Sequence, residues 1–552
     1  MSFKYTFKRV MTPNHEYPTG RANIINFIRY DHGMDTVENE MREILRRDLP
    51  CTWLLQYDAL VDGAYVDFLK THATASHEIG LWFEVNRRHC VDAGVPFRGE
   101  NYAADHEPDT LNWDHRSRAM MSCGYNRPER IRLIDTMMER FRGIFGSHPK
   151  SVAAWYIDSF SLDYLKDRFQ IVASANCRDS WGTDGYTFWG APLHAFYYPS
   201  QTNAMAVGET SETQIHLPVF RMLNVDPVDA HDISLCGNGQ AVLTLEPAYP
   251  DCGGDPKWIE NYFDLMGNGR TRPFAYFQVG QENGFEWNRI ARGFCAQLDT
   301  LVQRRDRGEL VVETLADTGR FCLEQWAQTP VGILHGDRSP SGTARRSLWY
   351  HSRKYRLGLE YSEDGLFLNS LDLYSKWDQE SHFSEPLNTY SSAFGALHAI
   401  DSFVFSSCLA LCGTHATGEP FDERDCPLRD VRVIVEGDTA VLTYRNSLGV
   451  SSCLRFDPDG IEIIREIPEG VTCKETLIYD RFSRFQTLQG IFENQLVFGW
   501  RNQSFRVVAE NVRRISQFPD DGQVVLMTSS SGTSRLRLGF RTEPPHKPDS
   551  PD

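Results

Sequence analysis

Short apolar runs alternate with amphipathic stretches between about residues 20 and 330. The run at 23–30 predicts a strand, the stretch at 36–47 predicts a helix with acids early and arginines late, and 51–56 predicts a second strand. Further strands are expected at 78–84, 152–157, 170–174, 241–245 and 274–278, with helices at 67–74, 128–145, 258–266 and 288–305. Such a repeat of βα units predicts a mostly parallel sheet closed into a (β/α) barrel, in a seven-stranded, distorted form.

The pattern changes from about residue 345, where apolar and polar positions alternate singly between turn signals. Segments 431–435, 439–444, 495–500 and 523–528 therefore predict strands of an antiparallel β-sandwich. Segment 335–342 is rich in turn formers and marks the expected boundary. We expect a barrel domain over 1–335, a sandwich domain over 345–543, and a disordered tail over 544–552.

The composition restricts the classes of partner. The 552 residues are 41% hydrophobic and 24% charged, as in ordinary globular proteins of two or three domains. A formal charge of −17 disfavours binding to nucleic acid or to an anionic membrane. No signal-peptide pattern and no run of 18 apolar residues occurs, and the 13 cysteines form no CxxC pair. These features predict a cytoplasmic protein with reduced thiols.

Segment 174–190 places charged and aromatic residues together in what its sequence predicts to be a loop. Carboxylates and guanidinium groups bind hydroxyls, and aromatic faces pack on the C–H faces of sugar rings, so this composition favours a neutral, hydroxyl-rich ligand. A packed aromatic loop with surface acids is the structural alternative. The candidate ligand-binding residues are Arg178, Asp179, Asp184 and Trp189, joined by Trp82 and Tyr198 elsewhere.

Acidic residues follow several of the expected strands, namely Asp31, Glu84, Asp158, Glu246 and Glu282, with Asp58 a weaker member. The carboxyl ends of parallel barrel strands converge on one mouth, so these groups are expected to meet there. A single acid at such a position commonly caps the next helix instead. Cleavage of a glycosidic bond needs one carboxylic acid and one carboxylate, which a set of five can supply.

Asp158 and Glu246 are the first candidates for the two catalytic carboxyl groups, because their apolar flanks favour a raised pKa for one of them. Asp31 is the next candidate for either role, beside His32, and Glu84 adds a further carboxylate. The run at 280–287 predicts substrate binding by Gln281 and Glu282 with Trp287 as a stacking face. A loop preceding a helix is the structural alternative for that run.

The sequence Ser76-His-Glu-Ile-Gly80 resembles a turn of the polysaccharide deacetylase superfamily, and Asp31 matches the position of its first acidic motif. The resemblance implies a distorted (β/α) barrel over about residues 20–300 and a divalent metal held by an aspartate and histidines. The runs 184–190 and 280–283 are also similar to bacterial proteins of uncharacterised glycosidase type, in which such a barrel precedes a β-sandwich.

The chain departs from the deacetylase pattern where the metal-binding histidines would stand, because residues 81–86 read Leu-Trp-Phe-Glu-Val-Asn. A three-ligand site would need His32 or His77. We therefore expect no metal and no cofactor, and a glycoside hydrolase that cleaves an oligosaccharide or glycoside by carboxylate chemistry. A metal-dependent deacetylase and a non-catalytic carbohydrate-binding protein are the alternatives. Motifs of nucleotide-binding proteins, zinc proteases and serine hydrolases do not occur.

Overall fold

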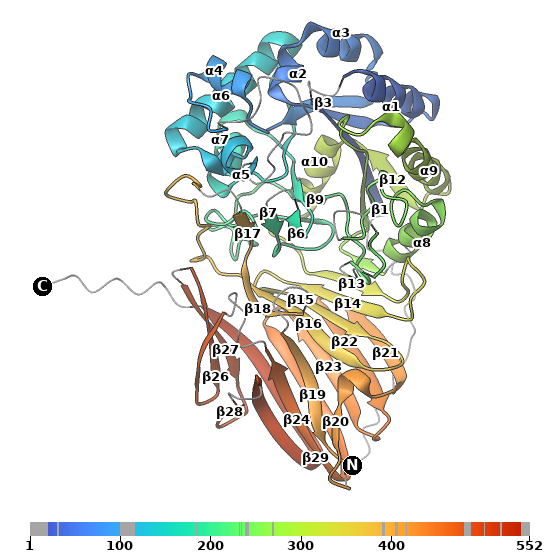
Figure 1. Ribbon diagram of the computed structural model, residues 1–552, viewed down its shortest axis with the longest axis vertical. Helices are drawn as coiled ribbons and strands as arrows, with labels where there is room; N and C mark the ends of the chain where they lie inside the picture. The colour runs from blue at the N-terminus through green and yellow to red at the C-terminus, as the bar shows by residue number, and fades with distance from the viewer. Residues whose placement is uncertain are drawn as a thin grey trace, which may run out of the picture.

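The computed structural model describes residues 20–29, 33–99, 116–183, 186–230, 232, 234–237, 242–267, 270–388, 392–402, 407–415, 417–479, 487–501, 503–518 and 522–542. Three candidate site residues, Asp31, His32 and Asp184, lie outside the described residues, as does the tail 544–552. A parallel sheet with helices around it forms one half of the molecule, and a large antiparallel sheet forms the other (Figure 1).

The parallel sheet has the strand order β11-β1-β2-β3-β4, and β12 pairs with the first half of β1. The register is continuous from Ile25 opposite Thr52 to Leu55 opposite Leu81. Nearly every residue of β1 and β2 is buried, as expected for strands covered on both faces. The strands are β1 (Gly20–Ile28), β2 (Cys51–Leu55), β3 (His77–Trp82), β4 (Val152–Ala153), β11 (Tyr276–Val279) and β12 (Leu310–Glu313).

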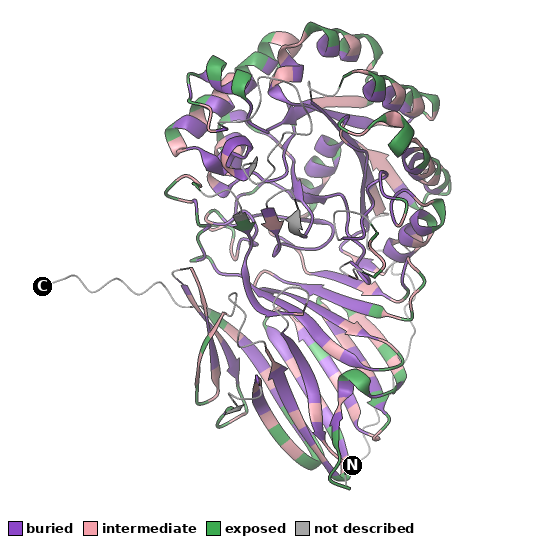
Figure 2. Cartoon of the chain, in the orientation of Figure 1, coloured by how far each residue is buried: buried purple, intermediate pink, exposed green. Residues whose placement is uncertain are grey.

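Helices pack around this sheet with their exposed faces outward (Figure 2). They are α1 (Asp35–Arg46), α2 (Tyr57–Val61), α3 (Gly63–His72), α4 (Arg87–Ala93), α5 (Arg116–Met120), α6 (Arg127–Phe145), α7 (Ser159–Phe169), α8 (Pro256–Met266), α9 (Trp287–Asp306) and α10 (Leu315–Gln325). Helix α6 begins with a complete capping box between Asn126 and Glu129. Among the helices described, none is long and apolar enough to span a bilayer.

Two further strands extend the parallel arrangement beyond β4. Strand β5 (Ser174–Cys177) lies beside β4, since the Ala154 amide donates to the Ala175 carbonyl at 3.3 Å, and β5 pairs in parallel with β9 (Val219–Met222). The segment after β9 contacts β11 through a side chain: the backbone amide of Gln278 in β11 donates to Oδ1 of Asn224 at 2.6 Å. Among the described residues, β9 and β11 are not paired as neighbouring strands. The arrangement is thus a parallel half-barrel sheet, and a closed (β/α) barrel is not confirmed.

Most expected strands occur, but two differ from expectation, and one expected loop contains strands. The strand expected at 170–174 starts later, at β5, and the one expected at 241–245 is replaced, in its described part, by a single antiparallel bridge from Thr244 to Val225. The expected loop at 174–190 holds β5 and the pair β6 (Ser180–Thr183) and β7 (Tyr186–Phe188). Strand β7 pairs with β17 (Ser392–Phe394), a contact between distant segments that local patterning cannot reveal.

The antiparallel sheet contains every strand expected after residue 345 and folds back on itself, because β24 pairs with both β19 and β29. Its strands, in chain order, are β10 (Thr271–Arg272), β13 (Gly332–Gly336), β14 (Arg346–His351), β15 (Tyr355–Tyr361), β16 (Leu366–Leu373), β18 (Leu397–Asp401), β19 (Cys408–Thr414), β20 (Pro420–Asp422), β21 (Leu428–Glu436), β22 (Thr439–Asn446), β23 (Ser451–Asp457), β24 (Gly460–Ile478), β25 (Leu488–Phe492), β26 (Gln495–Trp500), β27 (Gln503–Ala509), β28 (Ser516–Phe518) and β29 (Gln523–Thr542). The domain limits at 335 and 345 stay a prediction.

Candidate active site

Carboxylates and guanidinium groups alternate at the carboxyl ends of the parallel strands. Arg29 follows β1 and Glu84 follows β3, and Nε of Arg29 lies 3.7 Å from Oε2 of Glu84. On its other side, Nη1 of Arg29 lies 3.6 Å from Oε2 of Glu282, which follows β11. One guanidinium therefore holds two carboxyl groups from different strands close together.

A second ion pair lies beside the first. Nη2 of Arg178 donates to Oε1 of Glu246 at 2.7 Å, and Nε2 of Gln281 donates to Oε2 of the same carboxylate at 3.4 Å. Gln281 and Glu282 are neighbours in the chain, so the turn after β11 supplies one partner to each ion pair, and we treat the two pairs as one group. We call this group the mouth cluster, consisting of Arg29, Glu84, Arg178, Glu246, Gln281 and Glu282.

The backbone around residue 280 explains how Gln281 and Glu282 reach this place. Gly280 has φ +109°, and a Cβ there would stand 2.2 Å from the carbonyl oxygen of Ile25, so only glycine allows this close approach to β1. The next residues remain beside β1, where Glu282 bridges to Phe27 and the Arg29 amide donates to Oδ1 of Asn283 at 2.8 Å. The turn thus fixes two members of the cluster against a third.

Aromatic rings lie beneath the mouth cluster. Phe27 and Trp82 stack with centroids 4.2 Å apart, and Trp155 meets Trp82 edge-on at 5.2 Å. The indole Nε1 of Trp82 donates to Oε2 of Glu84 at 3.0 Å, which joins the ring to the charged group. Phe27 and Trp82 are 0 and 1% exposed, so these rings are part of the core that supports the charged group.

The mouth cluster is largely buried, and its ion pairs offset the cost of removing the charges from water. The side chains of Arg29, Glu84 and Arg178 are each 2% exposed, whereas that of Glu282 is 13% exposed. Burial lowers the pKa of Arg178, but the Glu246 carboxylate together with the neighbouring Cys177, Tyr249 and Tyr186 raises it overall. Glu282 is the most accessible of these carboxyl groups.

The described part of the mouth does not fit a divalent metal. Guanidinium groups already lie beside Glu84, Glu246 and Glu282, where they would repel a cation. Over the described ranges, no three His, Cys, Asp or Glu side chains gather as metal ligands. The described residues therefore do not form the metal-binding set that the deacetylase resemblance implies.

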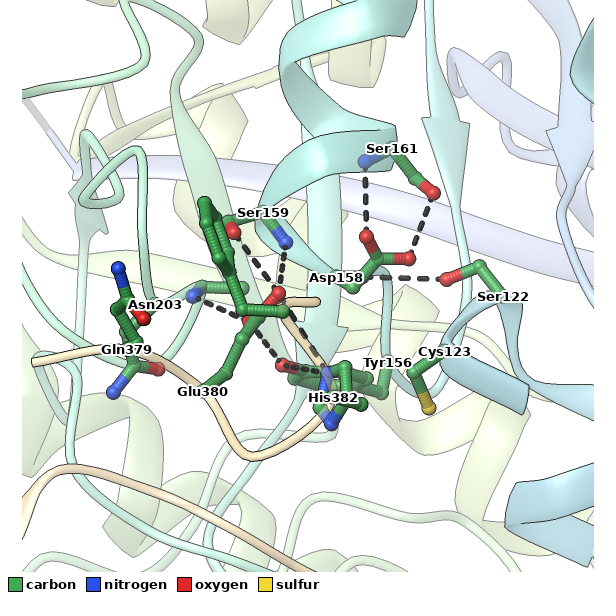
Figure 3. Close-up of polar contacts among 12 residues, drawn as sticks. Ser122, Cys123, Tyr156, Asp158, Ser159, Ser161, Asn203, Gln379, Glu380 and His382 are labelled. Carbon is green, nitrogen blue, oxygen red and sulfur yellow. Dashed lines mark hydrogen bonds and ion pairs between the residues drawn. The ribbon is translucent and has the colours of Figure 1, made fainter. Parts of the chain in front are cut away.

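The structure places Asp158 in a separate, fully buried group (Figure 3). Asp158 caps α7, since its Oδ1 accepts from the Ser161 amide at 3.1 Å and its Oδ2 from the Ser161 hydroxyl at 2.7 Å. Arg130 donates to Oδ1 at 2.8 Å. Burial raises the pKa of Asp158, but Arg130 and the other donors outweigh burial and leave the pKa below its usual value. These contacts are those of a helix cap rather than of a general acid.

Glu380, from the segment after β16, completes this second group. Its Oε1 accepts from the amide and hydroxyl of Ser159 at 3.0 and 2.9 Å, and its Oε2 accepts from the Tyr156 hydroxyl at 2.7 Å and the Ala204 amide at 3.1 Å (Figure 3). His382 lies 3.3 Å from the Tyr156 hydroxyl through Nε2. We call this group the clasp, consisting of Arg130, Tyr156, Asp158, Ser159, Glu380 and His382.

The clasp should make stability depend on pH through Glu380. Burial, followed by the charge of Asp158, raises the pKa of Glu380 to about 7, while its hydrogen bonds lower it. An acid whose pKa is raised in the folded state stabilises that state below about pH 4.5 and loses this contribution as the pH rises through 7. Native protein should therefore lose up to about 3 kcal/mol relative to Glu380→Gln between pH 5 and pH 8.

Urea unfolding of both proteins at the two pH values measures this difference. The comparison with the variant is needed because burial lowers the pKa of His382 to about 3, which gives the opposite slope below pH 6.5. The pKa values of Arg130 and Tyr156, which also face the group, are raised, so both keep their charge state in this range. A difference that stays constant with pH would contradict a raised pKa for Glu380.

Other candidate ligand-binding residues have contacts inside the core. Asp179 pairs with Arg221 at 2.6 Å and Arg356 at 2.7 Å. Trp189 is 2% exposed and donates to the Ala396 carbonyl at 2.7 Å. The Tyr198 hydroxyl donates to the carbonyls of Cys322 and Trp326, while Trp287 begins α9 and packs on Phe294. The structure does not bring these four to the mouth cluster; it does bring Trp82, Arg178, Gln281 and Glu282 there.

Sequence reasoning missed several charged residues of both groups. Arg29 lies near the carboxyl end of the first expected strand, at 23–30, and this position is a signal for a residue at the mouth. No sequence signal marks the other three residues. Arg130 lies in a helix, and Glu380 and His382 come from a segment some 220 residues after Asp158. Such contacts depend on tertiary structure alone.

No protein-family model and no curated protein matches the chain. Among solved structures it is similar to a Parabacteroides distasonis protein assigned as a glycoside hydrolase/deacetylase, at 12% identity and a TM-score of 0.47, covering 71% of this chain and 93% of that one. A Mycobacterium smegmatis protein assigned as a polysaccharide deacetylase is similar at 12% identity and a TM-score of 0.31, over 57% and 93%. Likenesses at this identity and these TM-scores transfer no activity to this chain.

Proposed function

We propose that the chain is a carbohydrate-active hydrolase that cleaves a glycosidic bond with the carboxyl groups of the mouth cluster. The observation that supports this most is the meeting of Glu84, Glu246 and Glu282 around two guanidinium groups above stacked aromatic rings. Paired carboxyl groups about 5 to 9.5 Å apart perform this reaction. Glu84 and Glu282 lie against the same guanidinium, and Gln281, next to Glu282 in the chain, donates to Glu246.

The contacts suggest a role for each carboxyl group. Glu246 accepts from Arg178 and Gln281, which fix its two oxygens, so we assign it the role of nucleophile or of a base that activates water. Glu84 accepts from Trp82 and pairs with Arg29. Glu282 is 13% exposed, more than Glu84 or Glu246, so on access alone we assign it the role of the acid that protonates the leaving oxygen. Trp82 positions the Glu84 carboxylate through its indole N–H.

The test is an activity panel on the full chain. Aryl glycosides and oligosaccharides are assayed for released aglycone and reducing ends, and acetylated oligosaccharides for acetate, each with and without EDTA. We expect glycosidic cleavage that the chelator leaves unchanged. Acetate release that disappears with EDTA would replace the proposal with a metal-dependent deacetylase. Sugar binding without either product would replace it with a carbohydrate-binding protein.

A further inference from the structure

A groove of ≈ 580 Å³ lies between the loop 247–254 and the start of α9. Its lining includes the faces of Pro247 and Tyr249 on one side and Arg289 and Arg292 on the other, with Asp251 at its edge. Pro247, the residue after Glu246, lines the groove, whereas its lining includes no member of the mouth cluster.

The loop is held against α9 as one piece. Nε2 of Gln297 donates to the carbonyls of Leu245 and Gly253 at 2.7 and 2.8 Å, on either side of the groove-forming loop. Gly293 allows the contact, because a Cβ there would stand 2.5 Å from the Pro247 carbonyl oxygen. The position of Glu246 and the shape of the groove are therefore set by the same contacts.

The groove carries positive charge in a chain whose net charge is −17. The Arg289 guanidinium lies 4.6 Å from the Phe285 ring centroid and 5.8 Å from that of Tyr249, and over the described ranges no ion pair joins it to a carboxylate. Arg292 pairs only loosely with Asp255, at 3.7 Å and with 72% of its side chain exposed. Asp251 opposes this charge, but its Oδ2 already accepts from the Gly237 amide at 2.7 Å.

We infer that the groove is a subsite for an acidic saccharide unit, with Arg289 and Arg292 binding its carboxylate or sulfate beside the bond that the mouth cluster cleaves. The inference rests on the proposed function for its saccharide ligand. A planar guanidinium binds carboxylate and sulfate oxygens through paired hydrogen bonds, and the ring of Tyr249 offers the adjoining face for the sugar. The neutral ligand favoured by the sequence composition is thereby replaced by an anionic one.

The experiment measures binding by calorimetry to full-length Glu246→Gln, so that turnover does not interfere. The probes are uronic-acid oligosaccharides, the same compounds as methyl esters, and sulfated oligosaccharides. We expect esterification to weaken binding at least about tenfold, and Arg289→Gln and Arg292→Gln each to weaken it about 10- to 100-fold. Arg307→Gln, at the far end of α9 and 57% exposed, is the matched control and should change binding less than about twofold.

The outcomes separate the two proposals. Equal binding of acids and esters, or groove variants that bind like the control, overturns the acidic subsite even if glycosides are cleaved. Arginine-dependent binding of acids by a chain that cleaves no glycoside supports the subsite and overturns the proposed reaction. A preference between uronates and sulfated probes shows which anion the groove takes, and a loss of affinity at high salt is expected for either.

Discussion

Glu246→Gln is expected to lower turnover of a cleaved glycoside by about 10²- to 10⁴-fold, the usual contribution of a positioned acid or base. The reason is that the amide cannot act as nucleophile or base, although its oxygen can still accept from Arg178, which now lies 2.7 Å from the carboxylate. The measurement is kcat with the best substrate of the panel, together with the thermal midpoint of each protein.

Two further variants separate chemistry from folding. Glu260→Gln alters a glutamate of α8 that is 61% exposed and should retain full activity. Glu246→Ala should regain part of its turnover when azide or formate is added, because a small anion can occupy the place of the missing carboxylate. Full activity in Glu246→Gln would remove Glu246 from the mechanism, and an inactive Glu246→Ala with no rescue but a lowered midpoint would indicate a structural role.

Arg130→Met is expected to destabilise the fold by about 3–5 kcal/mol, because it leaves the carboxylate of Asp158 buried without its cation. Both side chains are essentially unexposed, and Arg130 also donates to the carbonyls of Tyr125 and His382. Without Arg130 the pKa of Asp158 should rise, so the loss should be larger at pH 8 than at pH 5. Urea unfolding at the two pH values measures it.

The double variant Arg130→Met with Asp158→Asn should recover part of this stability, because no unpaired charge remains. Lys257→Met, which breaks an exposed pair with Glu260, is the surface control and should cost less than about 0.5 kcal/mol. A cost for Arg130→Met no larger than that of the control would show that the pair contributes nothing to the fold.

Local pattern was sufficient for most of the elements. Strands β1 and β2 are near-continuous apolar runs, which is the pattern of a strand buried on both faces. Strands of the antiparallel sheet such as β22 alternate apolar and polar positions, which is the pattern of a strand buried on one face. Strand β5 begins later than expected and the expected loop contains β6 and β7, because the pairing partners of such short strands, as β17 is for β7, lie far away in the sequence. The open edge beside β11 depends on the side chains of Asn224 and Gln278, which no periodicity reveals.

In the candidate site, too, local sequence pattern predicts some residues, and tertiary contacts decide the rest. Acids directly after strands, as at Glu84 and Glu282, could be placed at the mouth because parallel strands point their carboxyl ends the same way. Asp158 met the same criterion, yet its side chain turns to cap α7 and pair with Arg130. The choice between capping a helix and facing the mouth depends on which cation lies nearby, and that is a tertiary property.

The clasp also bears on how the chain divides. Glu380 satisfies two backbone amides and two hydroxyls of the parallel half, and Tyr374 and Phe394 belong to that half's apolar core. A fragment that stops at residue 335 would contain the amides and hydroxyls that donate to Glu380 but not Glu380 itself. Its apolar core would also lack Tyr374 and Phe394. The two halves are therefore not interchangeable modules. If the antiparallel half were exchanged for another domain, the segment around residues 374–394 would have to stay with the parallel half.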